Sequence, residues 1–209
     1  MARRGSWDCG TYITAMTRHI LIIQGHPDAS RPHFGHALAD AYTRGAQAAG
    51  HEVKTLSVAE LTFPFIHTYE EFYEQGPPEI IRDCQDLIRW ADHLVLIYPL
   101  WLGSMPALLK GFLEQVFRAG FAMKIENNGR KWTRLLKGKS ARVIITMGMP
   151  AFVYRWYFGA HSLKSLEKNI LKFCGIAPIH ESLVGMVEGS PAHRARWLSK
   201  LEKLGKQGK

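Results

Sequence analysis

Five short apolar segments alternate with five helix-like segments along the chain, and this alternation restricts the fold more than any other feature. Residues 19–24, HILIIQ, form the first apolar segment, and residues 34–49 form the first helical one. Strands that alternate with helices build βαβ units and a parallel sheet that is covered on both faces. The other strands are predicted at residues 52–58, 93–98, 141–147 and 176–186, and the other helices at 77–90, 106–117, 160–173 and 192–204.

A five-stranded parallel sheet between two helical layers is an α/β fold of three layers. For a chain of this size we predict the flavodoxin-like strand order 2-1-3-4-5 with right-handed crossovers. Residues 61–76 and 119–139 are predicted to be irregular, and the second segment carries the turn signal Asn128-Gly129. No internal repeat or linker interrupts residues 18–205, where we expect one flavodoxin-like domain. Residues 1–17 are predicted to form a disordered N-terminal extension.

The use of cysteine and the length of the apolar runs favour a cytoplasmic protein. Cys9, Cys84 and Cys174 form no CxxC pair, so neither a disulfide framework nor a metal site is indicated. No apolar signal-peptide segment precedes Thr17. The longest apolar runs are shorter than the ~20 residues that cross a bilayer, and we expect no stable membrane insertion.

The chain is basic, with a formal charge of +9. Such a charge suits nucleic acid, a membrane surface or small anionic ligands, but it also fits a solvated surface with basic ends. Residues 127–139, NNGRKWTRLLKGK, are the segment that best suits nucleic acid. They hold a single aromatic residue and lie between predicted elements as a surface insertion would, so we predict no nucleic-acid partner.

The topology also predicts where a ligand binds. In doubly wound sheets, ligands lie outside the carboxyl ends of the strands, at the switch point between strands 1 and 3. Residues 25–33 follow the first strand and residues 99–105 follow the third. Residues 148–159, after the fourth strand, should lie alongside them.

The first of these loops, GHPDASRPH, has the features of an anion site. Ser30 and Arg31 precede a helix whose free N–H groups attract negative charge. The loop is neither GxGxxG nor GxxxxGK[ST], which disfavours a Rossmann dinucleotide site and excludes a P-loop. The alternatives are that Ser30 only caps the helix, that Arg31 is solvated and that His26 is structural.

The second loop, within YPLWLGSMPALLKG, is apolar where loops are usually polar. An apolar loop at a switch point suits a flat ligand, whose polar edge the backbone N–H groups would bond. An isoalloxazine ring fits both demands. The alternative is that Trp101 and Leu102 pack under another loop or against a second subunit.

The third loop, within TMGMPAFVYRWYFGAH, combines a small residue with aromatic ones. Gly148 permits close approach of the backbone, and Tyr154, Tyr157 and His161 are candidate proton donors. The alternative for the neighbouring Trp156 and Phe158 is an aromatic packing or dimer patch.

Three segments, HPDASR, YPLWLGSMPALLKGFLEQVF and TMGMP, resemble the flavodoxin-like NAD(P)H:quinone oxidoreductases over about residues 19–187. That family includes general NAD(P)H dehydrogenases and the ancillary flavoproteins of potassium efflux systems. The resemblance implies a homodimer with flavin at the strand 1/strand 3 end and a substrate site that the partner chain completes. The chain departs from the family at His33, where Asn is frequent, and at TMGMP, where some members have Thr-Thr-Gly-Gly.

The resemblance also implies roles for residues of this chain. Each of the three loops would hold one part of the flavin: the ribityl-phosphate arm, the ring, or the pyrimidine edge of the ring. The family's catalytic tyrosine and histidine map onto the third loop, where Tyr157 competes for the tyrosine role. The arm is assigned to His26, Ser30 and Arg31; the ring to Pro99, Leu100, Trp101, Leu102 and Gly103; the pyrimidine edge to Thr146, Met147, Gly148 and Met149; and catalysis to Tyr154 and His161.

The expected function is that of a flavin-dependent NAD(P)H oxidoreductase. Hydride from NAD(P)H would reduce the flavin, which would then pass two electrons to a quinone or similar acceptor. The short chain favours FMN, with FAD as the alternative, and the choice between NADH and NADPH stays open. A regulatory flavoprotein subunit of a potassium-efflux transporter is the alternative function, and an electron-carrier flavodoxin is disfavoured by the basic charge.

Overall fold

The computed structural model describes residues 17–126 and 131–209. Nearly all of the predicted N-terminal extension therefore lies outside the described residues, as do Cys9 and residues 127–130 of the basic segment. The central sheet consists of β1 (His19–Gln24), β2 (Glu52–Ser57), β3 (His93–Pro99), β6 (Ser140–Thr146) and β7 (Ile179–Val184). All neighbouring strands are parallel, and their order is β2-β1-β3-β6-β7. Counted within the sheet this order is 2-1-3-4-5, as predicted.

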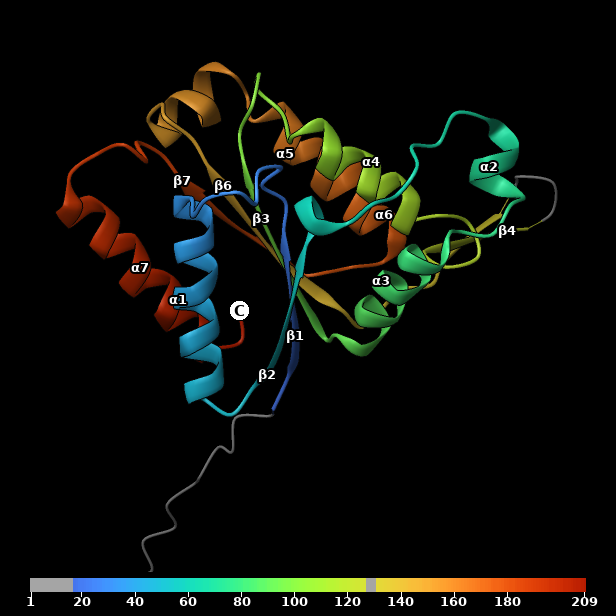
Figure 1. The fold of residues 1–209 in the computed structure, drawn as a ribbon, viewed down its shortest axis with the longest axis horizontal. Coiled ribbons are helices and arrows are strands. Elements are labelled where there is room, and N and C mark those ends of the chain that lie inside the picture. The colour runs from blue at the N-terminus through green and yellow to red at the C-terminus, as the bar shows by residue number, and fades with distance from the viewer. Residues whose placement is uncertain (1–16, 127–130) are drawn as a thin grey trace, which may run out of the picture.

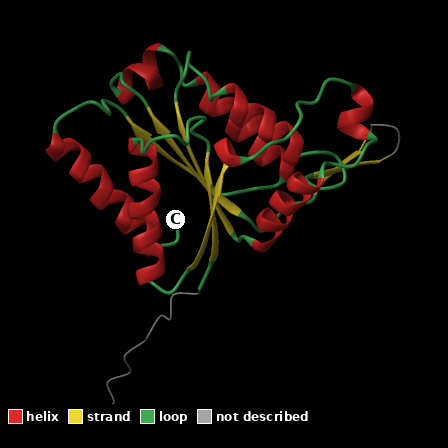
Figure 2. Ribbon diagram, in the orientation of Figure 1, coloured by secondary structure: helices red, strands yellow, loops and turns green. Residues whose placement is uncertain are grey.

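Helices cover both faces of the sheet. Figure 1 shows α1 and α7 on one side and α3, α4 and α6 on the other, and Figure 2 shows the strands as the middle of three layers. The helices are α1 (Phe34–Ala48), α2 (Tyr69–Tyr73), α3 (Glu79–Trp90), α4 (Ala107–Val116), α5 (His161–Ser165), α6 (Lys172–Cys174) and α7 (Pro191–Lys206). A 3₁₀ turn covers Val58–Glu60, and π-helical turns cover Val153–Tyr157 and Leu166–Leu171.

The apolar strands fill two cores, one on each face of the sheet. Ile20 and Ile22 of β1 pack with buried residues of α1 and α7. Leu21 and Ile23, which point to the opposite face, pack with α3 and α4. Successive side chains of a strand point to opposite faces, so a strand that is buried on both sides must be apolar throughout.

The edge strand β2 departs from this apolar composition. Its sequence is EVKTLS, and Glu52, Lys54 and Thr55 are exposed. The ammonium group of Lys54 lies 4.3 Å from the centre of the Trp90 ring. The edge of the sheet is therefore charged.

Residues 119–139 are not irregular throughout, which corrects the prediction. Strands β4 (Met123–Glu126) and β5 (Lys131–Arg134) pair in antiparallel fashion outside the main sheet. The ring of Trp132 lies 5.2 Å from that of Phe173, so the hairpin packs on the α5–α6 region. Each strand has only four residues, so the alternation of apolar and charged residues in MKIE is too short to predict a strand on its own.

Cys84 and Cys174 are free and buried, as a core role requires. Burial raises the pKa of Cys84 to about 11 and that of Cys174 to about 12. Both thiols therefore stay protonated and unreactive at neutral pH. Within the described part of the chain, no helix is long and apolar enough to span a bilayer.

Candidate active site

Backbone hydrogen bonds join the loops at the carboxyl edge of the sheet. Gly25 N–H donates to Ile97 at 2.7 Å, and Leu100 N–H donates to Thr146 at 2.8 Å. Met186 N–H, in the loop after β7, donates to Met149 at 3.2 Å. The structure therefore brings the loops 25–33, 99–105 and 148–159 together, above the strand ends in Figure 1.

Asp28 organises the first loop. Its Oδ1 accepts hydrogen bonds from the N–H of Ser30 at 2.8 Å and from its hydroxyl at 2.5 Å. Its Oδ2 lies 2.9 Å from Nε2 of His33 and 3.5 Å from Nε of Arg31. The hydrogen bonds from Ser30 hold the pKa of Asp28 well below its usual range. Ser30 and Arg31 are the residues predicted to bind a phosphate, and both contact Asp28. A phosphate bound at this loop would therefore compete with the Asp28 carboxylate for them.

His26 lies beneath this loop and touches the second one. Its ring stacks on that of His33 with centres 3.7 Å apart, and meets Trp101 edge-on at 5.9 Å. The N–H of Asp28 donates to Nδ1 of His26 at 3.1 Å. Burial, together with the charge of His33, lowers the pKa of His26. At neutral pH His26 is therefore an uncharged hydrogen-bonding group.

The second loop projects an apolar tip. Trp101 and Ser104 exchange backbone hydrogen bonds of 2.9 Å, which closes a tight turn. Trp101 is 50% exposed and Leu102 is fully exposed. Leu102 and Gly103 have φ angles of +49° and +76°. Among the described residues, nothing accepts a hydrogen bond from the N–H of either.

Part of the third loop also offers free N–H groups. Thr146 and Met147 are buried, and Met147 N–H donates to Val184. Gly148 is exposed, and an added Cβ would meet no atom within 4 Å. The N–H groups of Gly148 and Met149 find no acceptor in the described part of the chain. The segment can therefore donate to a ligand's acceptor atoms.

The predicted catalytic pair divides into a buried and an exposed residue. Tyr154 is 1% exposed, and its hydroxyl bonds Oγ of Ser162 at 2.8 Å and the N–H of Leu163 at 3.2 Å. His161 and Tyr157 are exposed, Tyr157 at 82%. The structure thus places the Tyr154 hydroxyl in the packing beside α5, while His161 and Tyr157 face solvent.

Among residues 17–126 and 131–209, three residues other than glycine have a left-handed backbone: Leu102, Ala160 and Met186, with φ between 48° and 53°. Each follows the carboxyl end of a different strand. Such a conformation costs about 1–3 kcal/mol and is concentrated at functional sites. The strain therefore marks the same edge of the sheet as the loop composition does.

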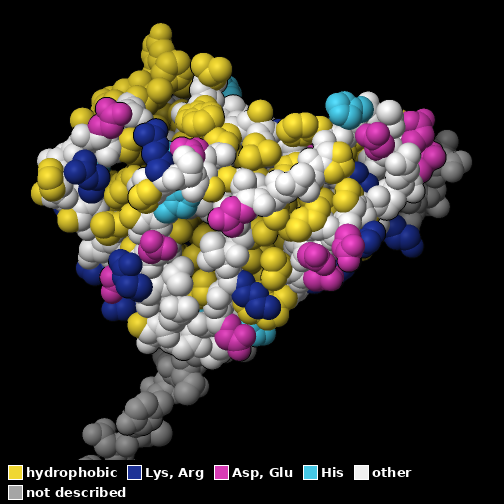
Figure 3. Space-filling model, viewed as in Figure 1, with side chains coloured by type: hydrophobic (Ala, Val, Ile, Leu, Met, Phe, Trp, Pro, Cys, Tyr) yellow, Lys and Arg dark blue, Asp and Glu magenta, His cyan; other side chains and the backbone are white. Residues whose placement is uncertain are grey.

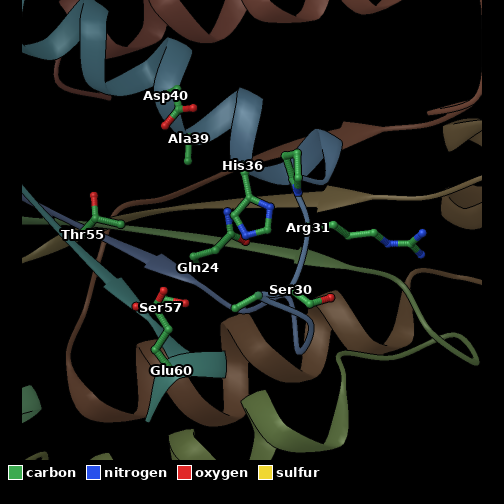
Figure 4. Close-up of a pocket in the computed structure, with 11 residues that line it drawn as sticks. Gln24, Ser30, Arg31, His36, Ala39, Asp40, Thr55, Ser57 and Glu60 are labelled. Atoms are coloured by element: carbon green, nitrogen blue, oxygen red, sulfur yellow. The ribbon is translucent and has the colours of Figure 1, made fainter.

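Sequence reasoning missed Asp28, His36 and Gln24. Nδ1 of His36 accepts from the N–H of His33 at 3.0 Å, which closes the start of α1. Gln24 and His36 line a hollow of about 510 Å³ between α1 and the end of β2 (Figure 4). Gln24 directly follows the four apolar residues 20–23 of β1, and this polar residue at the end of a buried run was the available signal. Asp28 lies in a turn-rich loop, where acids are common and give no such signal.

A parallel sheet of this order, with its polar and apolar loops gathered at the switch point, defines a doubly wound α/β protein, a class of fold whose ligands generally lie at that edge. Residues 18–206 match the family described as having a flavodoxin-like fold, and the chain belongs to this family.

Relatives with related names match most of the chain. An uncharacterised NAD(P)H oxidoreductase of Haemophilus influenzae is 35% identical over 169 residues, 79% of this chain and 82% of the relative. A human ribosyldihydronicotinamide dehydrogenase (quinone) is 29% identical over 166 residues, 73% and 69% of the two chains. An ancillary protein of a glutathione-regulated potassium-efflux system from Enterobacter matches more weakly, at 28% over 141 residues, 68% and 64%.

Solved structures show the same fold. The NAD(P)H:quinone oxidoreductase of Methanothermobacter marburgensis superposes with a TM-score of 0.79 at 26% identity, over 91% of this chain and 98% of the other. The FMN-dependent NADH-azoreductase of Bacillus anthracis, in complex with FMN, superposes with a TM-score of 0.70 at 17% identity, over 91% and 99%.

Proposed function

We propose that this protein is a flavin-dependent NAD(P)H oxidoreductase that reduces a quinone or a similar acceptor by two electrons. The observation that carries the proposal is the exposed apolar tip at Trp101 and Leu102, beside unpaired N–H groups at the strand 1/strand 3 edge. Family membership supports it, as do relatives named NAD(P)H oxidoreductase and quinone dehydrogenase.

The residues at this edge fit a flavin in chemistry. Pro99, Leu100, Trp101, Leu102 and Gly103 offer apolar side chains and backbone to a flat ring, and the N–H groups of Gly148 and Met149 suit the acceptor atoms of the pyrimidine edge. His26, Ser30 and Arg31 at the start of α1 suit the ribityl-phosphate arm. Thr146 and Met147 shape the base of the site. The N–H and hydroxyl of Ser30 donate to Asp28, so a phosphate would compete with this carboxylate for them.

A bound flavin supplies hydride acceptance from NAD(P)H and two-electron donation to the acceptor. The apolar tip at Trp101 and Leu102 would exclude water from the position of the isoalloxazine ring. The N–H groups of Gly148 and Met149 stabilise negative charge that develops at the pyrimidine edge. We assign proton donation to His161 or Tyr157, since both are exposed, and a positioning role to Tyr154, which holds Ser162 and Leu163.

We favour FMN as the cofactor. The chain is short, and an FMN-dependent azoreductase in complex with FMN shares the fold, which supports FMN without excluding FAD. The net positive charge of the chain supports NAD(P)H as the co-substrate, because it would attract the negatively charged phosphates of the nucleotide.

We also propose a homodimer whose partner completes the active site. Phe152, Trp156, Tyr157 and Phe158 are exposed within seven residues, next to the candidate site, with Trp156 at 78%. Figure 3 shows hydrophobic side chains gathered at the end of the molecule where this segment lies. An apolar patch of this kind marks an interaction surface, and a second copy would place it beside the partner's flavin.

The test is the visible absorption spectrum of the purified protein before and after addition of NADPH, and separately NADH, under argon. We expect the flavin absorption bands to bleach within seconds after the nucleotide is added and to return when a quinone is added. Gly103→Val should lose the flavin, because a side chain at φ +76° displaces the turn; Gly76→Val, at an open position with ordinary φ, is the control.

Flavin bands that persist with both nucleotides would contradict the proposal and favour the alternative, a flavoprotein subunit of a potassium-efflux transporter. Co-purification with a membrane protein would then be the decisive measurement. A colourless protein that takes up neither FMN nor FAD would contradict both.

A further inference from the structure

The strand β7 forms the edge of the sheet opposite β2, and its backbone is unpaired on the outer side. The strand order ends at β7, which pairs with β6. Val184 faces β6, because its carbonyl oxygen accepts from the N–H of Met147. This direction alternates along a parallel strand, so three residues point their N–H and C=O groups away from β6: Ile179, Glu181 and Leu183. The described residues offer no backbone partner to these groups.

A groove of about 340 Å³ lies at this edge. Residues 181–183 of β7 form part of its lining, and the third loop and α7 supply the rest. Figure 1 shows α7 on the same side of the molecule as β7. The loop and the helix contribute Phe152, Arg155, Trp156, Trp197 and Lys200. Side chains therefore border the groove, while the backbone of a strand edge is open within it.

The surroundings of the groove are positively charged. Arg155 forms an ion pair with Glu181, so these two charges offset each other. The ammonium group of Lys200 lies 4.4 Å from the centre of the Trp197 ring. Lys203, one turn further along α7, is exposed as well. A ligand with negative charge is therefore favoured at this edge.

An extended peptide matches both features of the edge. Its N–H and C=O groups alternate with the same spacing as those of β7, so it can add a strand to the sheet. A bilayer or a nucleic acid could neutralise the lysines but offers no such row of backbone partners. A second copy, paired through β7 about a twofold axis centred on the groove, would place Glu181 opposite its own copy. Like charges in that position destabilise a strand pair.

We propose that β7 and its groove bind an extended acidic peptide segment of a partner protein. The peptide backbone pairs with Glu181 and Leu183, and the acidic side chains lie near Lys200. Phe152 and Trp156 also belong to the patch proposed for the dimer, so the inference relies on β7 and α7 alone. It does not depend on the flavin chemistry.

The test is the fluorescence anisotropy of a fluorescein-labelled hexapeptide of alternating valine and glutamate, titrated with the purified full-length protein. We expect saturable binding. The same peptide with N-methyl groups on all its amides cannot donate to a strand and should bind at least tenfold more weakly. Lysine in place of each glutamate should also weaken binding at least tenfold. With the glutamate peptide bound, hydrogen exchange at the Glu181 amide should slow at least tenfold.

Two substitutions at one position separate the backbone from the side chain. Glu181→Pro removes an N–H that points away from β6, at an edge position where proline is tolerated, and should weaken peptide binding at least tenfold. Glu181→Gln keeps that N–H and loses the ion pair with Arg155, and should bind within about threefold of wild type. Lys200→Glu should weaken binding at least fivefold. Lys172→Glu, at an exposed position on α6 outside the groove, is the control and should not change it.

A wild-type protein that does not bind the peptide, or binds its N-methylated form equally well, would overturn the proposal. An equal loss in Glu181→Pro and Glu181→Gln would attribute binding to the side chain and contradict strand addition. If Glu181→Pro converts a wild-type dimer into single chains, a second copy occupies the edge and the proposal is wrong. Should Glu181→Pro fail to fold, the N-methylated peptide and Lys200→Glu still decide between the outcomes. Bleaching of the flavin by NADPH tests the proposed function separately.

Discussion

At the scale of single residues, burial decides which groups can change protonation state. His93, the first residue of β3, is fully buried, and its Nδ1 lies 2.7 Å from Oγ of Ser140. Its Nε2 has no partner among the described residues. Burial lowers the pKa of His93 to about 3, and the charges of Arg18 and Arg142, with His180 and His51, act in the same direction. His93 is therefore neutral in the folded protein.

This buried histidine should make the protein sensitive to acid. The folded pKa of about 3 lies below the unfolded value of 6.5, so the unfolded chain binds the additional proton between these values. The free energy of unfolding should fall by about 1.4 kcal/mol for each pH unit below 6.5, and therefore by about 2 kcal/mol at pH 5. Urea unfolding at pH 7 and pH 5 measures this. His93→Gln should reduce the change in the free energy of unfolding between pH 7 and pH 5. If the variant shows the same change as wild type, the assignment to His93 is wrong. His67→Gln, at an exposed position, is the control.

Tyr154 allows a second test, because its geometry separates positioning from catalysis. Tyr154→Phe removes the hydrogen bonds to Ser162 and Leu163, and we expect a loss of about 1–2 kcal/mol in the free energy of unfolding. The pH profile of NADPH oxidation should keep its shape, with kcat within about threefold of wild type. A hundredfold fall in kcat with unchanged stability would instead make Tyr154 the proton donor. Tyr157→Phe, which removes an exposed hydroxyl, is the matched comparison.

At the scale of elements, hydrophobic periodicity predicted the strands and helices that pack in the two cores. It did not predict the elements whose formation depends on contacts between distant side chains. Each predicted strand and helix is present with ends within a few residues, because burial on two faces forces apolar runs. The hairpin β4–β5 was missed because its packing depends on the contact between Trp132 and Phe173, which are distant in sequence. In the candidate active site, too, the side-chain contacts could not be predicted from periodicity. Topology predicted that the three loops meet, but not that Tyr154 would turn inward to Ser162.

The contact between α1 and α7 gives a prediction at this scale. A Cβ on Gly45 would lie 1.9 Å from the carbonyl oxygen of Glu202, and one on Gly205 would lie 2.1 Å from that of Tyr42. The two backbones therefore touch, and Gly45→Ala must separate the helices. We expect a loss of about 1–3 kcal/mol in the free energy of unfolding. Gly76→Ala, where a Cβ meets no atom within 4 Å, should change it by less than about 0.5 kcal/mol. Equal stability of both variants would refute the close contact.

At the scale of the whole molecule, one end is apolar while the chain as a whole is basic. The exposed aromatic residues of the third loop lie at the same end as the tip of the second loop. The charge of +9 opposes association of identical copies at long range. A pair of copies must therefore gain its stability from apolar contact at that end, and salt should strengthen it by screening the repulsion.

Trp156→Ser should break such a pair. We expect light scattering after size exclusion to show the mass of two chains for wild type at micromolar concentration and the mass of one chain for the variant. Turnover with quinone should fall at least tenfold, because the partner completes the site. Tyr69→Ser, at an exposed aromatic on α2, should leave both unchanged. A variant that stays dimeric, or a monomer with full turnover, would contradict the proposed shared site.

The charged side chains along β2 have a consequence for how copies can meet. An outer strand with unpaired N–H and C=O groups is a template on which another chain can add a strand, and repeated addition gives fibrils. On β2, Glu52 and Lys54 flank that template, and Lys54 is drawn over Trp90. Two copies aligned along β2 would have to desolvate these charges. This side of the sheet therefore resists filament growth, and concentrated native protein should not polymerise through it.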